Sequence, residues 1–182
     1  MAHSFEDKLC AILVAHKIIT AQEAKALHKN FHDSSKETFD DFLLSESLIK
    51  KEDLLKALSE YYQIPSFDVV GHFFDHSLLL EFPQDVLINH GIIPLERDEN
   101  MLFIVASQPD NEELLPELAE YVSDEIQFFV GLKPDILDAV IEYYQDSPFQ
   151  IDEEHMDEDE EDELYEDEDA LEDVYNNRDD DY

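Results

Sequence analysis

Two pairs of histidines have a spacing that could hold a metal ion. His28 and His32, and likewise His72 and His76, are four residues apart, which places both rings of a pair on one face of a helix. Such a pair binds zinc when further nitrogen, sulfur or carboxylate ligands complete a tetrahedral site. Neither an HExxH motif nor a cysteine accompanies them. We therefore interpret them as surface or bundle-edge histidines and predict no metal site.

Nucleophilic catalysis and phosphate transfer also lack a local signature. No Ser/His/Asp or Cys/His arrangement with a recognisable spacing occurs, and the three glycines, Gly71, Gly91 and Gly131, are too scattered to form a phosphate-binding loop. Cys10 is the only cysteine, so no intramolecular disulfide can form, and we interpret it as a small buried hydrophobe. We expect a protein that is not an enzyme, with no catalytic residue and no cofactor.

The charge of the chain restricts its partners. Its 48 acidic and 11 basic residues give a formal net charge of −37. Residues 151–182 alone contain nineteen Asp and Glu residues against a single basic residue, Arg178. Because neither part of the chain presents a cluster of lysine and arginine, binding to the phosphates of DNA or RNA is not expected.

The first residues carry no targeting signal that we recognise. Lys8, His16 and Lys17 interrupt the apolar run near the start, and no basic region precedes it. A secretory signal peptide or a membrane-spanning helix would need an uninterrupted apolar segment. We expect a cytoplasmic protein that does not insert into a membrane directly and that becomes peripheral to the inner membrane only through a partner.

Four short helices are predicted in the first third of the chain. Three of them begin with a hydroxyl residue three positions before a carboxylate, which is the pattern of a capping box. These pairs are Ser4 with Asp7, Thr20 with Glu23 and Thr38 with Asp41, and the predicted helices span 5–16, 21–32, 38–46 and 51–62. The helices are amphipathic, so they must pack together to bury their apolar faces.

The four helices form two copies of one helical hairpin, offset by thirty residues. The matched residues are Leu9 and Phe39, Leu13 and Leu43, Val14 and Leu44, and the pairs Ile18-Ile19 and Leu48-Ile49. We predict that the apolar pair of each copy fills the corner between the two helices of its hairpin.

Strands and turns are predicted after Pro65. The stretch "IPLERDENMLFIVASQ" (93–108) has two apolar runs around a polar tip and predicts a β-hairpin, and "IQFFVGL" (126–132) predicts a third strand. Between them, "NEELLPELAEYVSD" is typical of a helix. The last helix begins near Pro134, and its expected buried face consists of Ile136, Leu137, Val140, Ile141 and Tyr144.

These elements predict an α+β protein in three parts. Residues 1–64 form a bundle of about four short helices, and residues 65–148 form a small α/β subdomain with about three strands. Residues 149–182 form an acidic tail that repels itself and contains too few apolar residues to fold alone, so we expect it to be disordered.

The acidic tail contains apolar residues at spacings near one and two helical turns. These are Leu164, Tyr165, Leu171, Val174 and Tyr175. Binding to a basic partner with an apolar groove could induce a helix here, which makes the five residues candidates for partner binding. Two alternatives stay open: a tail that only keeps the protein soluble, and a tail that mimics nucleic acid and covers a basic surface.

Three phrases of the sequence resemble a known family. "FLLSESLIKKEDLLKALSEYYQIPSFDV", "FPQDVLINHGIIPLERDENMLFIVASQPDN" and "IQFFVGLKPDILDAVIEYY" are similar to the N-terminal domain of type II secretion and type IV pilus assembly ATPases, of the general-secretion-pathway E-type or MshE-type. The likeness covers about residues 5–145. It implies a bundle of short helices followed by a small α/β part. The motor's phosphate-binding motif, GxxxxGK followed by Ser or Thr, does not occur, so the resemblance indicates a stand-alone domain without the motor.

Some members of this family bind cyclic di-GMP through two copies of the motif RLGxxLLxxGLI. At the Arg and two Gly positions of the motif, the first copy has Lys8, Cys10 and Lys17, and the second has Thr38, Asp40 and Ser47. The apolar positions are kept as Leu9 and Leu13 in the first copy and as Phe39 and Leu43 in the second. A carboxylate repels phosphate, and side chains replace the glycines that would allow close approach. We interpret both copies as degenerate nucleotide motifs that serve as scaffold.

The function that the sequence favours is therefore a non-catalytic adaptor or regulator that binds another protein. The resemblance implies a partner from a secretion or pilus machinery, either its ATPase or a component of the inner-membrane platform. Two other functions stay open at this point. One is a sensor whose degenerate motifs recognise some other nucleotide, and the other is an acidic effector or inhibitor that masks a basic surface. The oligomeric state is not predicted.

Overall fold

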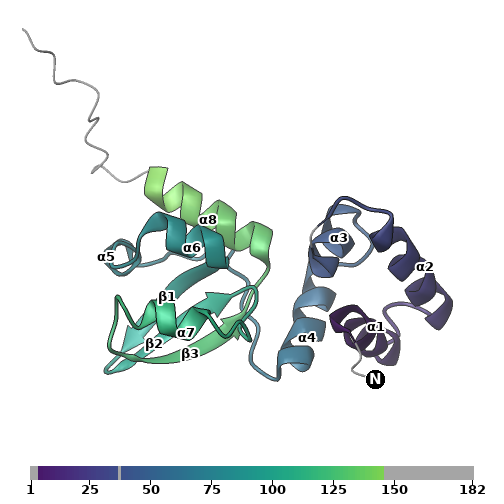
Figure 1. Ribbon diagram of the computed structural model, residues 1–182, viewed down its shortest axis with the longest axis horizontal. Coiled ribbons are helices and arrows are strands. Elements are labelled where there is room, and N and C mark those ends of the chain that lie inside the picture. The colour runs from purple at the N-terminus through teal and green to yellow at the C-terminus, as the bar shows by residue number, and fades with distance from the viewer. Residues whose placement is uncertain (1–3, 37, 146–182) are drawn as a thin grey trace, which may run out of the picture. The chain divides into compact units, whose positions relative to one another are not determined.

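The computed structural model describes residues 4–36 and 38–145, and within them the chain forms eight helices and one three-stranded sheet (Figure 1). The elements are, in order, α1 (Phe5–Ala15), α2 (Ala21–His32), α3 (Phe39–Ser45), α4 (Lys51–Tyr62), α5 (His76–Leu79), α6 (Gln84–His90), β1 (Ile92–Asp98), β2 (Met101–Ala106), α7 (Leu114–Leu118), β3 (Glu125–Val130) and α8 (Lys133–Gln145). The predicted α+β class is confirmed, with four helices before an α/β part of three strands. The predicted acidic tail, 149–182, lies outside the described residues, as do its five candidate partner-binding residues.

Two of the three predicted capping boxes form. Ser4 accepts a hydrogen bond from the backbone N–H of Asp7, and Thr20 accepts one from that of Glu23. The third prediction was wrong: the side chain of Thr38 makes no cap hydrogen bond to α3. The next two residues, Phe39 and Asp40, are both buried, so packing rather than a side-chain cap decides how α3 begins.

The repeat of the helical hairpin is confirmed in the backbone of its two corners. Lys17, after α1, has φ 59°, and Ser47, after α3, has φ 52°. Beyond them, the N–H of Ile18 donates to the carbonyl of Leu13 at 3.0 Å, as the N–H of Leu48 does to that of Leu43. Both corners are therefore helix ends of the Schellman type, in which one left-handed residue reverses the chain. The corner packing differs from our prediction, because Ile49 is buried while Leu48 is 44% exposed.

Glycine at these two corners should stabilise the protein. A left-handed conformation costs a residue that carries a Cβ atom about 1–2 kcal/mol, and the freedom that glycine adds to the unfolded chain offsets part of this. We expect Lys17→Gly and Ser47→Gly each to raise the free energy of unfolding by about 0.5–1 kcal/mol in urea denaturation. Lys56→Gly, inside the exposed face of α4, is the matched control and should lower it by about 1 kcal/mol. Equal losses at all three positions would contradict the corner geometry.

The helical bundle encloses one hydrophobic core. Its fully buried side chains come from α1, α3 and α4: Leu9, Leu13, Phe39, Leu43, Leu54 and Leu58. Helix α1 packs against α4 and against α2. Val130 and Leu132, from the end of β3 and the turn after it, belong to the same core. The packing of the bundle therefore includes residues that follow it in the chain by about seventy positions.

The sheet has the order β1-β2-β3, with β1 and β2 antiparallel and β2 and β3 parallel. The predicted hairpin is confirmed, and Glu99 at its tip has φ 52°. The register shifts between Pro94 and Glu96, a bulge at the place where proline lacks the N–H that a ladder needs. Parallel pairing of β2 with β3 requires a crossover, which contains the predicted helix in shortened form as α7.

Helix α8 packs against α6 and against strands β1 and β2 (Figure 1). It begins at Lys133, so Pro134 is its second residue. Ile136 and Val140 are fully buried, whereas Ile141 is 37% exposed and does not belong to the buried face as predicted. The buried stripe runs at i, i+4 and i+8 through Tyr144, whose hydroxyl donates to the carbonyls of Leu79 and Phe82. Ile141 lies beside this stripe because each residue turns the helix by about 100°.

The connection between bundle and sheet is held by both polar and backbone contacts. Lys51 Nζ lies 2.8 Å from a carboxylate oxygen of Asp68 and 2.8 Å from one of Asp135. Burial raises the pKa of Asp68, but the hydrogen bonds from Lys51 and from the N–H of Val70, together with the charge of Lys51, lower the pKa below its ordinary value. The N–H of Val130 donates to the carbonyl of Pro65, so the connection runs along the end of β3. In the part of the chain that is described, no helix has the length and apolar character needed to cross a membrane.

Candidate functional site

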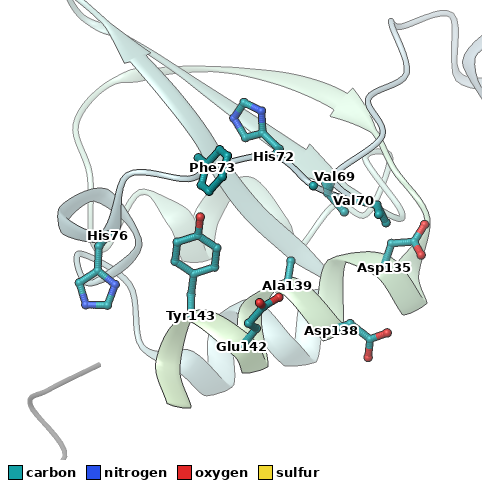
Figure 2. A pocket seen from close by; sticks show the side chains of 11 residues that line it. Val69, Val70, His72, Phe73, His76, Asp135, Asp138, Ala139, Glu142 and Tyr143 are labelled. Atoms are coloured by element: carbon teal, nitrogen blue, oxygen red, sulfur yellow. The ribbon is translucent and has the colours of Figure 1, made fainter. Parts of the chain in front are cut away.

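One groove in the α/β part combines an exposed aromatic ring with an acidic helix. We call it the α8 groove; it has a volume of about 610 Å³ and lies between residues 69–76 and α8. Figure 2 shows Val69, Val70, His72 and Phe73 on one side of it, and five residues of α8 on the other: Asp135, Asp138, Ala139, Glu142 and Tyr143. Phe73 is 93% exposed.

The conformation of residues 69–76 follows from the packing of one aromatic ring. Phe74 is buried, its ring meets that of Tyr143 edge to face at 5.6 Å between centroids, and its N–H donates to the Tyr143 hydroxyl at 2.6 Å. Gly71 permits the turn before it with φ 75°. Because Phe74 occupies the interior, its neighbour Phe73 must point away from it in this extended segment, and its ring meets solvent.

The acidic side of the α8 groove is only partly neutralised. Asp135 is paired with Lys51, whereas Asp138 and Glu142, four residues apart on α8, take part in no ion pair within the described residues. The groove therefore offers an apolar surface, formed by Val70, Phe73 and Ala139, beside two carboxylates that face water. Such a surface suits a ligand that is both apolar and basic.

The histidine pairs of the sequence lie in different environments. His28 stacks on Phe39 at 5.6 Å between ring centroids, while His32 is exposed. His72 and His76 both belong to the α8 groove, where Figure 2 shows them at separate places along residues 69–76. Within residues 4–36 and 38–145, no group of three or more His, Cys, Asp or Glu side chains is arranged to hold a metal ion.

A second concave site lies where the helical bundle meets the loop after β2. We call it the aromatic pocket; its volume is about 270 Å³. Its lining combines five aromatic rings with carboxylates and small polar groups: Phe5, Phe31, Phe39, Tyr61, Tyr62, Glu6, Asp40, Asp110, Thr38, Ser107 and Gln108. The pocket thus contains positions of the second degenerate motif together with residues that sequence reasoning did not connect with them.

The structure separates the predicted motif positions into two groups. The apolar ones, Leu9, Leu13, Phe39 and Leu43, have at most 1% of their surface exposed and build the core of the bundle. Lys8, Lys17 and Ser47 are exposed, and Thr38 is half-buried. Only Thr38 and Phe39 of these eight line the aromatic pocket.

At the first glycine position of each motif the chain places a buried side chain. Cys10 is 4% exposed, and burial, with smaller contributions from Asp7 and Glu6, raises the pKa of its thiol to about 11. The prediction of a buried, hydrophobe-like Cys10 is confirmed. Its counterpart Asp40 is 8% exposed, and burial, followed by the charge of Asp41, raises the pKa of its carboxyl. The pKa of Tyr62 is raised as well, by burial first and then by Asp110 and Asp40.

Replacing Asp40 should change how stability depends on pH. Because its pKa is higher in the folded than in the unfolded chain, the folded state binds the proton more tightly, and the free energy of unfolding falls as pH rises from about 4 through the folded pKa. We expect Asp40→Asn to remove this fall and to raise the free energy of unfolding at pH 7 by about 1–3 kcal/mol. Urea denaturation between pH 3 and pH 8 measures both effects. Asp98→Asn, at the exposed hairpin tip, is the control and should leave the pH dependence unchanged.

Sequence reasoning missed both Phe73 and the pocket around Asp40. The signal for Phe73 was present in "GHFFD", because two adjacent phenylalanines in an extended segment cannot both point into one core. The aromatic pocket had no such signal, since Phe5, Asp40, Tyr61 and Asp110 are far apart in the sequence.

Comparison with known proteins confirms the resemblance found in the sequence. Residues 74–150 match the MshEN domain family. A structure of MshE with cyclic di-GMP (cdg) has a TM-score of 0.61 and 18% sequence identity, covering 75% of this chain and 98% of that one. A structure of the XpsE N-terminal domain has a TM-score of 0.54 and 15% identity, covering 79% and 97%. At these identities the two structures show a common fold. No curated protein matches the chain by sequence.

Proposed function

We propose that this chain, which has the fold of the N-terminal domains of secretion and pilus ATPases, is a non-catalytic docking module that binds a partner protein through the α8 groove. The observation that carries the proposal is the exposure of Phe73, 93% of whose surface meets solvent beside the groove. Large exposed apolar side chains in a concave, rigid surface favour a partner that covers them. The two sides of the groove are joined beside Phe73, because the hydroxyl of Tyr143 on α8 accepts a hydrogen bond from the N–H of Phe74.

The chemistry of the groove defines the partner segment. The carboxylates of Asp138 and Glu142 favour lysine or arginine in the partner segment. Val70, which is 64% exposed, and Phe73 favour an apolar side chain of the partner that packs against both. The net charge of −37 favours fast association with a basic surface. The same charge makes the chain's own residues 151–182 a poor occupant, because their carboxylates would meet those of α8.

The partner that we propose is a component of a secretion or pilus machinery, either its motor ATPase or the cytoplasmic part of its inner-membrane platform. Support comes from the family resemblance of the sequence, from the MshEN match and from the fold shared with MshE and with the N-terminal domain of XpsE. In this proposal the chain acts on the cytoplasmic side of the membrane and carries out no chemistry itself.

Photo-crosslinking from the groove tests the proposal. A benzophenone side chain introduced at position 73 should crosslink to one protein in the native cell, and mass spectrometry should place the crosslink in a segment with lysine or arginine beside apolar residues. Leu115 is the control position, because it is 52% exposed on α7, outside the groove. An equally strong crosslink of the same protein from position 115, or a crosslink to an acidic segment, would contradict docking in the groove.

Affinity measured with the purified partner gives the second part of the test. Phe73→Ala, and separately Asp138→Asn combined with Glu142→Gln, should each weaken binding about tenfold or more, whereas Leu115→Ala should not. The charge variant should also reduce the salt dependence of binding, since it removes the ionic contribution. Equal affinities of all variants would refute the proposed surface.

The acidic tail is a second proposed contact, which the same assay separates from the groove. Leu164, Tyr165, Leu171, Val174 and Tyr175 are its candidate residues. Truncation before Ile151 should weaken binding in a strongly salt-dependent way if the tail takes part, and should leave the loss caused by Phe73→Ala unchanged. Binding that vanishes on truncation and is indifferent to Phe73 would instead favour a tail that masks a basic surface.

A further inference from the structure

The aromatic pocket has the composition of a site for an organic cation, and we propose that it binds an alkylguanidinium or alkylammonium group. The inference does not depend on docking in the α8 groove, because the two sites share no lining residue. It rests on three properties of the pocket: the arrangement of its rings, the state of its carboxylates and its size.

The rings of the pocket meet at right angles. Phe5 and Tyr61 have centroids 4.9 Å apart at an interplanar angle of 87°, and Tyr61 and Tyr62 have centroids 4.7 Å apart at the same angle. These edge-to-face contacts fix the positions of three rings that line the pocket, and aromatic rings attract cations. The ring of Tyr61 already attracts an ammonium group of this chain, because Lys8 Nζ lies 5.7 Å from its centroid.

The carboxylates of the pocket have no counter-charge among the residues that the structure describes. Asp40 is 8% exposed, and within the described residues neither it nor Glu6 nor Asp110 forms an ion pair. Among the residues that the structure describes, no lysine, arginine or histidine lines the pocket. A buried carboxylate without a counter-charge is costly, and a cation that enters the pocket would remove this cost. Thr38 Oγ1, on the same wall, is buried and could accept an N–H.

The size of the pocket limits what can enter. Sites for drug-sized ligands span roughly 300–1,000 Å³, whereas this one has about 270 Å³. It can hold one planar or tetrahedral cationic head with a short apolar stem. A free amine and a side chain of a second protein both offer this chemistry, since lysine and arginine end in the same groups.

Titration with n-butylguanidinium, followed by the NMR signals of the tyrosine rings, tests the proposal on the full chain. We expect saturable shifts at Tyr61 and Tyr62, and affinity about tenfold or more lower in Asp40→Asn. N-butylurea, the neutral isostere, should not saturate the pocket, and Asp98→Asn should bind like the unchanged protein. Asp110→Asn provides a second pocket variant at an exposed position, where the substitution leaves folding intact, and it should also weaken binding.

The outcome is decisive in either direction. Absence of saturable shifts, equal affinity for butylurea, or undiminished affinity in both Asp40→Asn and Asp110→Asn would overturn the proposal. If butylguanidinium binds, spermidine and N-acetyl-arginine amide identify the source of the natural cation. Tighter binding of spermidine supports a free amine, and tighter binding of the capped arginine supports a protein side chain.

Discussion

Phe39→Ala should lower the free energy of unfolding by about 3–5 kcal/mol, the usual cost of deleting a buried phenylalanine ring. Phe39 is 1% exposed and begins α3. Its ring meets Phe31 edge to face at 5.3 Å and stacks on His28 at 5.6 Å, so it joins the second helical hairpin to the end of the first. The loss combines removal of apolar surface from the core with a cavity that the surrounding helices cannot fill. Urea denaturation at pH 7 measures it.

Phe73→Ala is the matched control, because it removes the same atoms from a side chain that is 93% exposed. We expect it to change the free energy of unfolding by less than about 0.5 kcal/mol. Its effect should appear in partner binding instead. A comparable loss of stability in the two variants would mean that Phe73 is covered in the free protein, and the docking surface would then be wrong.

Gly131→Ala should lower the free energy of unfolding by about 1–3 kcal/mol, because the new methyl group has no room. A Cβ atom at this position would lie 2.4 Å from Val105 Cγ1 and 3.1 Å from Ile136 Cδ1. The residue cannot move away easily, since its N–H donates to the carbonyl of Ala106 at 3.0 Å and thereby continues the ladder between β2 and β3.

A double-mutant cycle isolates this clash. Val105→Ala removes the methyl group that the new Cβ would meet, so Gly131→Ala should cost less in that background, with a coupling energy of about 0.5–3 kcal/mol. Gln127→Ala, at an exposed position of β3, controls for general effects of alanine in the strand. Strictly additive losses at Gly131 and Val105 would show that the two sites do not interact.

The two proposed sites can be tested independently with these variants. Phe73→Ala should weaken docking and leave cation binding unchanged, whereas Asp40→Asn should weaken cation binding while stabilising the fold. Greater stability together with lost binding is expected where a buried charge is kept for a ligand. Replacing a residue with a purely structural role would not raise the stability of the fold while weakening cation binding.

The sequence by itself determined the elements whose stabilising contacts are local. The bounds of α1 and α2 follow from capping side chains and apolar residues at helical spacing, and those of α4 from its apolar spacing; each was predicted to within one residue. The hairpin from β1 to β2 follows from its polar tip in the same way. The repeat of the helical hairpin was also predictable from the sequence, because apolar side chains that must be buried together recur at the same spacing in both copies.

Short elements depended on contacts that no local pattern contains. Helices α5 and α6 were not predicted. Helix α5 has only four residues, and the contact at its end comes from far along the chain: the hydroxyl of Tyr144, some sixty positions later, donates to the carbonyls of Leu79 and Phe82. The cap at Thr38 failed for a similar reason, since burial of Phe39 and Asp40 overrode the local signal.

Tertiary structure alone decided the two functional surfaces. Phe73 and Phe74 are equivalent in the sequence, and only the hydrogen bond and ring contact with Tyr143 place one inside and the other in water. Asp40 became part of an aromatic pocket because packing of α1, α3 and α4 brought Phe5 and Tyr61 beside it. Periodicity specifies which faces must be buried, but the neighbours that each face meets depend on how distant segments pack, and that packing creates the sites.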